Sequence, residues 1–170
     1  MPDQPHAIVV IGVAGSGKTT VARALAQRCG LDFLDADDLH GADAKAQMAA
    51  GVPLTDAQRE PWVDALARAL RARARQGRSS VLAYSGLRAA HRQRLRDSGV
   101  PMRFIFLHAA PAAIAARLAL RHDHFLPAEL LDSQLQALQP PTAERDVVAV
   151  EAGGSRASVL DAVLAAVRAP

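Results

Sequence analysis

Cysteine is nearly absent from this chain: Cys29 is its single thiol, so no disulfide can form within it. A chain without internal disulfides fits a reduced, cytoplasmic setting. No apolar run approaches the ~20 residues of a membrane-spanning helix. Residues 1–6 lack the basic segment and long apolar core of a secretory signal. We therefore expect a cytoplasmic protein with no membrane span.

Aromatic side chains are also scarce and make up 4% of the residues. The formal net charge is +3, and 18 of the 20 basic residues are arginine, because only Lys18 and Lys45 are lysines. A surface poor in aromatics offers few platforms for stacked bases, so we expect no nucleic-acid partner. Arginine binds phosphate through two parallel hydrogen bonds, so an enzyme that handles small phosphorylated molecules explains the charge.

The length and the order of apolar segments indicate the fold class. The chain has 170 residues, half of them hydrophobic, which predicts one domain over residues 1–170. Segments with helical spacing separate five short apolar runs, which we expect to be strands at 7–11, 31–35, 80–84, 102–107 and 147–150. This alternation predicts an α/β fold with a parallel, doubly wound sheet.

Residues 12–19 fit the P-loop pattern G-x-x-x-x-G-K-[ST], between the first expected strand and a helix that continues through Thr20. Glycines permit a turn that directs successive N–H groups inward, and the helix N-terminus adds partial positive charge. The pattern predicts ATP binding, with Lys18 at the β- and γ-phosphates and Thr19 as an Mg²⁺ ligand. The alternative is a glycine-rich turn without a ligand. The predicted phosphate-binding residues are Gly12, Val13, Ala14, Gly15, Ser16, Gly17, Lys18, Thr19 and Thr20.

Carboxylates follow the second expected strand. Asp35 and Asp37 lie two residues apart, which places them on the same side of an extended backbone. Such a strand end lies at the edge where open α/β sheets bind ligands. One carboxylate would order the acceptor hydroxyl or take its proton, and the other would hold Mg²⁺ through water. The alternative is a solvated acidic turn or a helix cap.

Two further segments carry candidate cations. Arg88 and Arg92 follow the third expected strand four residues apart on one helical face, where they would bind an anionic acceptor or form a solvated surface. Residues 111–138 predict two helices separated by a polar break, an arrangement that commonly acts as a lid. Its arginines would cover the phosphates and exclude water. The spacing of His122 and His124 does not predict a metal site.

Several segments together resemble the gluconate kinase (gluconokinase) family of P-loop small-molecule kinases, which is related to shikimate and adenylate kinases. The resemblance spans about residues 8–141. Its motifs are the P-loop, Asp35–His40, Met48–Asp56 with Arg59 and Pro61-Trp62, Ser85 with Leu87, Arg92 and Leu95-Arg96, and His124–Pro127 with Leu130–Gln134, Leu138 and Pro140.

The resemblance implies a P-loop NTPase three-layer sandwich, with a five-stranded parallel sheet of order 2-3-1-4-5 and a helical lid at about residues 117–140. It implies ATP-dependent phosphorylation of D-gluconate to 6-phospho-D-gluconate with Mg²⁺, in the cytoplasm and often as a homodimer. Asp37 would orient or deprotonate the acceptor hydroxyl and hold Mg²⁺ with Thr19. Arg117 and Arg121 would be lid cations beside the transferring phosphoryl group. The implied acceptor-binding residues are Asp35, Asp37, His40, Arg59, Arg88, Arg92, His124 and Gln134.

The chain departs from the family pattern mainly on the acceptor side. Ala36 replaces a glycine, Tyr84 replaces a cysteine, and Ala44 and Gln47 replace an asparagine and a lysine. The usual tyrosine and glutamate align with His91 and Gln139. Two alternatives stay open: a kinase of another small hydroxy acid or polyol (shikimate-like), and a nucleotide-binding regulatory module with a degenerate acceptor site.

Overall fold

The computed structural model describes residues 3–120 and 128–169. Its sheet has five strands that pair in parallel, in the order β2-β3-β1-β4-β5. The predicted fold class and strand order are therefore confirmed. The strands are β1 (Ala7–Ile11), β2 (Asp32–Asp35), β3 (Ser80–Ala83), β4 (Met102–His108) and β5 (Val147–Glu151).

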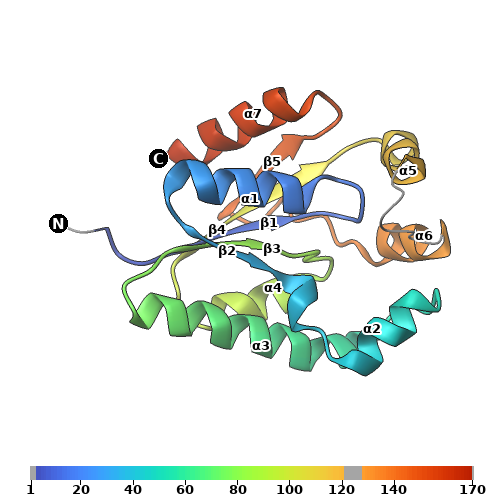
Figure 1. The fold of residues 1–170 in the computed structure, drawn as a ribbon, viewed down its shortest axis with the longest axis horizontal. Helices are drawn as coiled ribbons and strands as arrows, with labels where there is room; N and C mark the ends of the chain where they lie inside the picture. The colour runs from blue at the N-terminus through green and yellow to red at the C-terminus, as the bar shows by residue number, and fades with distance from the viewer. Residues whose placement is uncertain (1–2, 121–127, 170) are drawn as a thin grey trace.

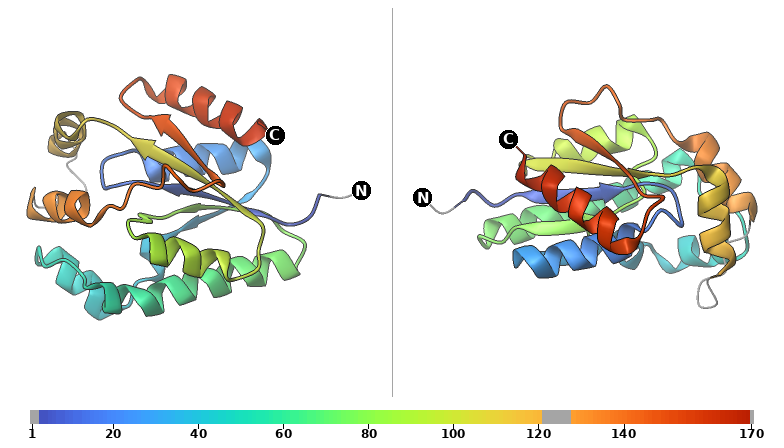
Figure 2. Two further views of the ribbon diagram at one scale, coloured as in Figure 1. Left: turned by 180° about the vertical axis from the view of Figure 1, so that it is seen from behind. Right: turned by 90° about the horizontal axis from the view of Figure 1, so that it is seen from above.

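Helices cover both faces of the sheet and give three layers. In Figures 1 and 2, α1 and α7 lie on one face, and α3 and α4 lie on the other. The remaining helices α2, α5 and α6 lie beyond the carboxyl ends of the strands (Figure 1). The bounds are α1 (Lys18–Cys29), η1 (Ala36–Leu39), α2 (Ala42–Ala49), α3 (Asp56–Arg75), α4 (Ala89–Arg96), α5 (Pro111–Ala119), α6 (Ala128–Ala137) and α7 (Arg156–Arg168).

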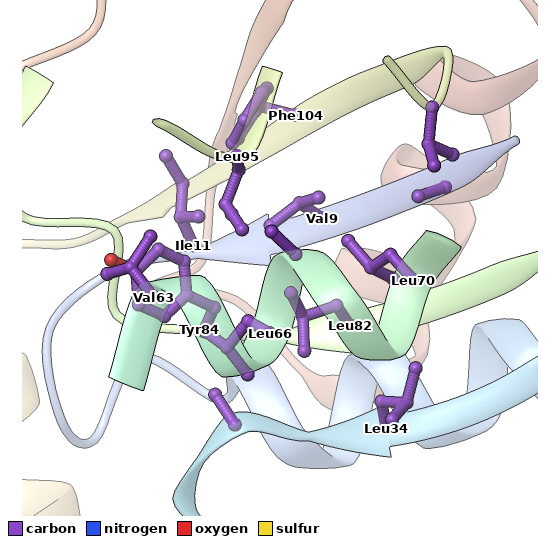
Figure 3. Close-up of a cluster of buried hydrophobic side chains, with 14 of the residues drawn as sticks. Val9, Ile11, Leu34, Val63, Leu66, Leu70, Leu82, Tyr84, Leu95 and Phe104 are labelled. Atoms are coloured by element: carbon purple, nitrogen blue, oxygen red, sulfur yellow. The ribbon is translucent and has the colours of Figure 1, made fainter. Parts of the chain in front are cut away.

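The central strand β1 is apolar without alternation because both of its faces are buried. Val9 and Ile11 face α3 and α4 in a cluster that includes Leu66 and Leu95 (Figure 3). Ile8 and Val10 face α1 and α7 in a second cluster with residues such as Leu25 and Val163. Parallel sheets covered on both faces have such continuous apolar strands. This packing fixes the strand end from which the P-loop begins.

A third, smaller cluster lies at the carboxyl edge of the sheet. Val13 of the P-loop and Leu87 of the β3–α4 loop pack there with Ile114 of α5 and with Leu131 and Ala137 of α6. The second half of the predicted lid is therefore packed against the P-loop and the β3–α4 loop. Over residues 3–120 and 128–169, no helix is both long and apolar enough to cross a membrane.

The start of α3 is held by reciprocal hydrogen bonds. The Gln58 backbone N–H donates to Thr55 Oγ1 at 3.1 Å, and the Thr55 N–H donates to Gln58 Oε1 at 2.9 Å. This capping box satisfies two amides of the first turn. Gln47 of α2 joins it, because the Gln58 amide donates to Gln47 Oε1 at 3.0 Å. Gln47, which replaces the family's lysine, thus fastens α2 to α3.

Candidate active site

The P-loop forms a tight turn between β1 and α1. Gly17 caps α1 with φ 95°, a conformation that favours glycine. Gly12 is equally constrained, since a Cβ there would lie 2.7 Å from the Leu107 carbonyl oxygen. The first amides of α1 have no intrahelical acceptors and are suited to an anion. The Lys18 ammonium donates to the Val13 carbonyl oxygen at 3.0 Å, so its charge stays at the loop.

A pocket of about 430 Å³ opens beside the P-loop. Thr20, Val21 and Ala24 of α1 form one wall, and the β5–α7 connection together with the first residues of α7 forms the other. Its volume lies in the range of small-molecule sites, and its apolar lining suits a flat heterocycle. Two arginines, Arg117 and Arg156, reach this pocket. Arg117, a predicted lid cation, donates to the Ala152 carbonyl oxygen.

Arg156 was missed in the sequence analysis. It is the first residue of α7, directly after the glycine pair Gly153-Gly154 and Ser155. Its position could have been predicted from the sequence, because Gly153-Gly154 come after the last strand and Arg156 follows them. A parallel sheet brings the carboxyl ends of all its strands to one edge, where ligands bind. Arg156 adds a second cation to the wall that faces the P-loop.

The acidic segment after β2 is joined to the P-loop through Asp35. Thr19 Oγ1 donates to Asp35 Oδ2 at 3.4 Å, and the Asp37 N–H donates to Asp35 Oδ1 at 3.0 Å. Burial raises the pKa of Asp35 above its ordinary value, and the bond from the Asp37 backbone offsets part of this rise. The Asp37 carboxylate is exposed in η1.

The oxygens of Thr19 and Asp35 are hard donors of the kind that Mg²⁺ takes. The donor set therefore fits this ion. The sequence analysis paired Thr19 with Asp37 for the metal, whereas the structure brings Thr19 to Asp35. The reason is local: the turn into η1 makes Asp35 the cap of η1, with its carboxylate toward α1, while Asp37 lies in the first turn of η1. The Asp37 carboxylate is therefore separate from the Thr19–Asp35 pair and exposed to solvent.

An aromatic stack lies next to η1. His40 stacks on Trp62 with ring centroids 3.8 Å apart, and Trp62 meets Tyr84 edge to face at 5.1 Å. Trp62 Nε1 donates to the Ala36 carbonyl oxygen at 2.7 Å, which fastens η1 to α3. His40 was expected to bind the acceptor, but the structure buries it in this stack, with 8% of its surface exposed. Tyr84, the replacement for cysteine, completes the stack.

The buried His40 predicts a pH-dependent stability. Burial, with the charges of Lys45 and Arg59, lowers the pKa of His40 from 6.5 to about 4. Below pH 6.5 the unfolded chain binds a proton at His40 that the folded protein does not bind. This difference lowers the free energy of unfolding as pH falls from 6.5 to 4.

We expect His40→Phe to show a smaller fall in Tm between pH 7 and pH 4.5 than the unchanged protein, measured by calorimetry. Phenylalanine keeps a stacked ring on Trp62 but does not titrate. Burial also lowers the pKa of His91, but that residue contributes equally to both proteins and cancels in the comparison. Identical pH slopes would contradict the assignment.

Arg59 and Arg88 were predicted to bind the acceptor and are brought together by Asp56. Arg59 donates to Asp56 Oδ1 at 3.2 Å, and Arg88 Nε donates to the same oxygen at 3.3 Å. Arg59 comes from the first turn of α3, and Arg88 is the N-cap residue of α4. One carboxylate thus holds two guanidinium groups from different helices at one place. A carboxylate of an acceptor would find both cations there.

Arg92 differs from its prediction as an acceptor-binding residue. Its side chain is fully buried. The guanidinium donates to the carbonyl oxygens of Gly86 and Gln139 at 2.6 and 2.9 Å, and to Glu144 Oε1 at 2.6 Å. The four-residue spacing does not align it with Arg88, because Arg88 lies outside the helix as its cap. Arg92 therefore holds two loops together inside the protein.

We expect Arg92→Met to lower the free energy of unfolding by about 3 kcal/mol, measured by urea denaturation. The figure lies at the lower end for a broken buried ion pair, because Glu144 keeps Arg96 as a partner at 2.6 Å. Arg94→Met on the same helix is the control and should change the midpoint little, since the Arg94–Asp64 pair is exposed to solvent. A variant of unchanged stability whose only defect is a raised KM for the acceptor would restore the predicted binding role.

The remaining predicted residues divide into two groups. Arg121 and His124 lie outside the described residues. Gln134, expected at the acceptor, lies on α6, and its Oε1 accepts a hydrogen bond from the Ala14 N–H at 2.7 Å. The side-chain amide oxygen of Gln134 therefore binds the P-loop backbone.

A parallel sheet of order 2-3-1-4-5, with a glycine-rich loop and a Lys-Thr pair between its central strand and α1, defines a P-loop NTPase fold. The family model described as an AAA domain matches residues 8–141. The gluconokinase of Gluconobacter oxydans (strain 621H) is 40% identical over 147 residues, which cover 86% of this chain and 83% of that protein.

Two solved structures agree with this result. The gluconokinase from Sinorhizobium meliloti 1021 is 38% identical with a TM-score of 0.86, over 95% of this chain and 91% of that one. An unliganded sugar kinase from a Janibacter species is 35% identical with a TM-score of 0.88, over 95% and 93%. The chain belongs to the gluconokinase family.

Proposed function

We propose that this protein is a gluconokinase, which transfers the γ-phosphoryl group of ATP to D-gluconate to give 6-phospho-D-gluconate and ADP. The observation that carries the proposal is the convergence of two sites at one edge of the sheet, in a chain of this family. The P-loop forms the donor site. The acceptor site is formed by Asp37, Arg59 and Arg88.

The donor site binds ATP by its phosphates and by its base. The amides at the start of α1 and the Lys18 ammonium receive the phosphates, and the 430 Å³ pocket receives the nucleoside between α1 and the β5–α7 connection. Arg117 and Arg156 place positive charge at its rim, and we propose Arg121 as a further lid cation. Positive charge at this rim stabilises the negative charge that develops on the transferring group.

Mg²⁺ is the second proposed cofactor, and Thr19 and Asp35 are the residues that would hold it. When bound, the ion neutralises charge on the β- and γ-phosphates. The Thr19 hydroxyl and the Asp35 carboxylate lie 3.4 Å apart, between the phosphate loop and the acidic segment. Asp35 therefore joins the donor site to the residue that faces the acceptor, Asp37.

The acceptor site orients one hydroxyl for attack. Arg59 and Arg88 bind the carboxylate of gluconate, and Asp37 accepts the hydrogen bond of the reacting hydroxyl. The hydroxyl oxygen forms a bond to the γ-phosphorus, the bond to the β,γ-bridging oxygen breaks, and the proton passes to the Asp37 carboxylate. ADP is the leaving group. We also propose His124 as a residue that contacts gluconate.

The proposal is tested with purified protein, Mg-ATP and a panel of gluconate, other sugar acids, shikimate and neutral polyols, in a coupled assay of ADP release. Gluconate should raise turnover well above the background ATPase, and identification of 6-phospho-D-gluconate by mass spectrometry should confirm the product. Stimulation by a different acceptor alone would replace gluconate. The absence of stimulation by every acceptor, with ATP still bound, would indicate a regulatory nucleotide-binding module. We further propose a cytoplasmic homodimer, which light scattering and cell fractionation test.

A further inference from the structure

Helix α6 and the segment that follows it carry two glutamines, Gln134 and Gln139, that bind opposite sides of the active site. Figure 1 places α6 next to the loop that follows β1, at the carboxyl end of the sheet. Leu131 and Ala137 fix the helix there by packing with Val13 of the P-loop and Leu87 of the β3–α4 loop. These apolar contacts hold α6 in place but do not set the position of either loop along the helix. Hydrogen bonds are directional and do so.

The first glutamine binds the donor side. Gln134 Oε1 accepts from the Ala14 N–H at 2.7 Å, across 120 residues of sequence. Ala14 lies in the middle of the P-loop, between Gly12 and Gly15, where the backbone has no helical partner of its own. The neighbouring Gly15 is closely covered by α5, because a Cβ there would lie 2.9 Å from Leu118 Cγ. Gln134 therefore fixes the backbone of the P-loop between Gly12 and Gly15.

The second glutamine binds the acceptor side. The Gln139 N–H donates to the Leu87 carbonyl oxygen at 2.7 Å, and its Oε1 accepts from the Ala89 N–H at 2.7 Å. Leu87 and Ala89 flank Arg88, the residue that we assign to the acceptor carboxylate. Within the described part of the chain Arg88 does not cap α4 with its own side chain, and Gln139 supplies that cap. The Arg92 guanidinium donates a hydrogen bond to the backbone carbonyl oxygen of Gln139 at 2.9 Å.

We propose that Gln134 and Gln139 act together as a brace that sets the spacing between the donor phosphates and the acceptor carboxylate. Both are positioning residues: one fixes the P-loop and the other fixes Arg88. Only four residues, 135–138, lie between them. Phosphoryl transfer depends on the attacking oxygen lying in line with the phosphorus, and a misplacement of 1 Å costs as much as ~10²-fold in rate. The expected loss of kcat rests on the proposed function, whereas the two hydrogen-bonded contacts and the coupling of the P-loop to the β3–α4 loop do not.

The kinetic test compares Gln134→Met and Gln139→Met with Gln136→Met, an exposed glutamine of the same helix. Methionine keeps the length of the side chain and removes the hydrogen bond. Each brace variant should lower kcat for gluconate at least about 10-fold, with KM for ATP and for gluconate within about 2-fold of the original. The share of ATP lost to water should rise in both. Gln139→Glu keeps an acceptor oxygen for Ala89 and should restore kcat.

Hydrogen exchange tests the brace independently of the acceptor. Gln139→Met should speed exchange of the Ala89 amide and also of the distant Ala14 amide, because the two loops are joined through one segment. Gln136→Met should change neither amide. If Gln134→Met and Gln139→Met match the control in kcat and in exchange while the unchanged protein phosphorylates gluconate, the brace is wrong. If gluconate is not phosphorylated at all but exchange is coupled as expected, the proposed function fails and the brace stands.

Discussion

Replacing Lys18 by alanine is expected to lower gluconate-dependent turnover by at least ~10²-fold, the scale seen when one preorganised charge-stabilising group is removed. The Lys18 ammonium lies 3.0 Å from the Val13 carbonyl oxygen at the start of α1. Its positive charge is therefore held at the P-loop, where we propose that the β- and γ-phosphates bind. Charge on these phosphates grows as the terminal bond breaks, so the ammonium stabilises the transition state more than bound ATP.

The other lysine of the chain, Lys45, provides the matched control. Lys45 is exposed on α2, and Lys45→Ala removes the same charge from outside the P-loop. Steady-state kinetics should show a loss of kcat in Lys18→Ala alone, and thermal unfolding should show that both variants are folded. A Lys18→Ala protein that keeps turnover within a few-fold of the original would exclude the assigned role.

The parts of the fold that depend on local pattern were predictable from the sequence. The P-loop was recognised because its glycines, Lys18 and Thr19 act through neighbouring backbone. The first strand was recognised because a strand covered on both faces is apolar at every position, as Ala7–Ile11 is. The sheet order came from the family resemblance, and the structure confirms it.

The partners of polar side chains were not predictable, because they come from distant parts of the chain. Gln134 binds an amide 120 residues away, and Arg92 binds Glu144 across 52 residues. Neither separation has a periodicity that a sequence pattern reveals. A long polar side chain near the active site looks the same in sequence whether it faces substrate or a buried carbonyl group. Which of the two a side chain faces depends on the charge and burial around it, and these are known only from the three-dimensional structure.

The acidic segment shows the same limit over a short distance. The two-residue spacing of Asp35 and Asp37 predicts that both lie at the site but leaves their roles open, and the family resemblance assigned both the acceptor hydroxyl and Mg²⁺ to Asp37. The separation depends on where β2 stops: Asp35 is its last residue and caps η1, which turns Asp35 toward Thr19 and leaves Asp37 exposed. The position at which β2 ends thus separates Asp35, which we propose as a ligand of Mg²⁺, from Asp37, which we propose as the residue that faces the acceptor.

This division makes Asp37→Asn the second large prediction. The change should lower phosphoryl transfer to gluconate by ~10² to 10⁴-fold, the range for loss of a general base. Asparagine keeps the shape and the backbone N–H that donates to Asp35 Oδ1 at 3.0 Å, but its amide takes no proton. The Kd for Mg-ATP, measured by calorimetry, should stay within about 2-fold, because the phosphates are bound by the P-loop and not by Asp37.

Two neighbours make the test of Asp37 specific. Asp38→Asn removes an adjacent exposed carboxylate of η1 and should leave turnover nearly unchanged. Asp35→Asn should instead raise the Mg²⁺ concentration needed for half-maximal turnover, because Asp35 is the carboxylate beside Thr19. If Asp37→Asn rather than Asp35→Asn shifts the Mg²⁺ requirement, the two roles are exchanged. Turnover that survives in Asp37→Asn would require the acceptor hydroxyl to lose its proton elsewhere, since a carboxylate at position 37 is the base that the geometry offers.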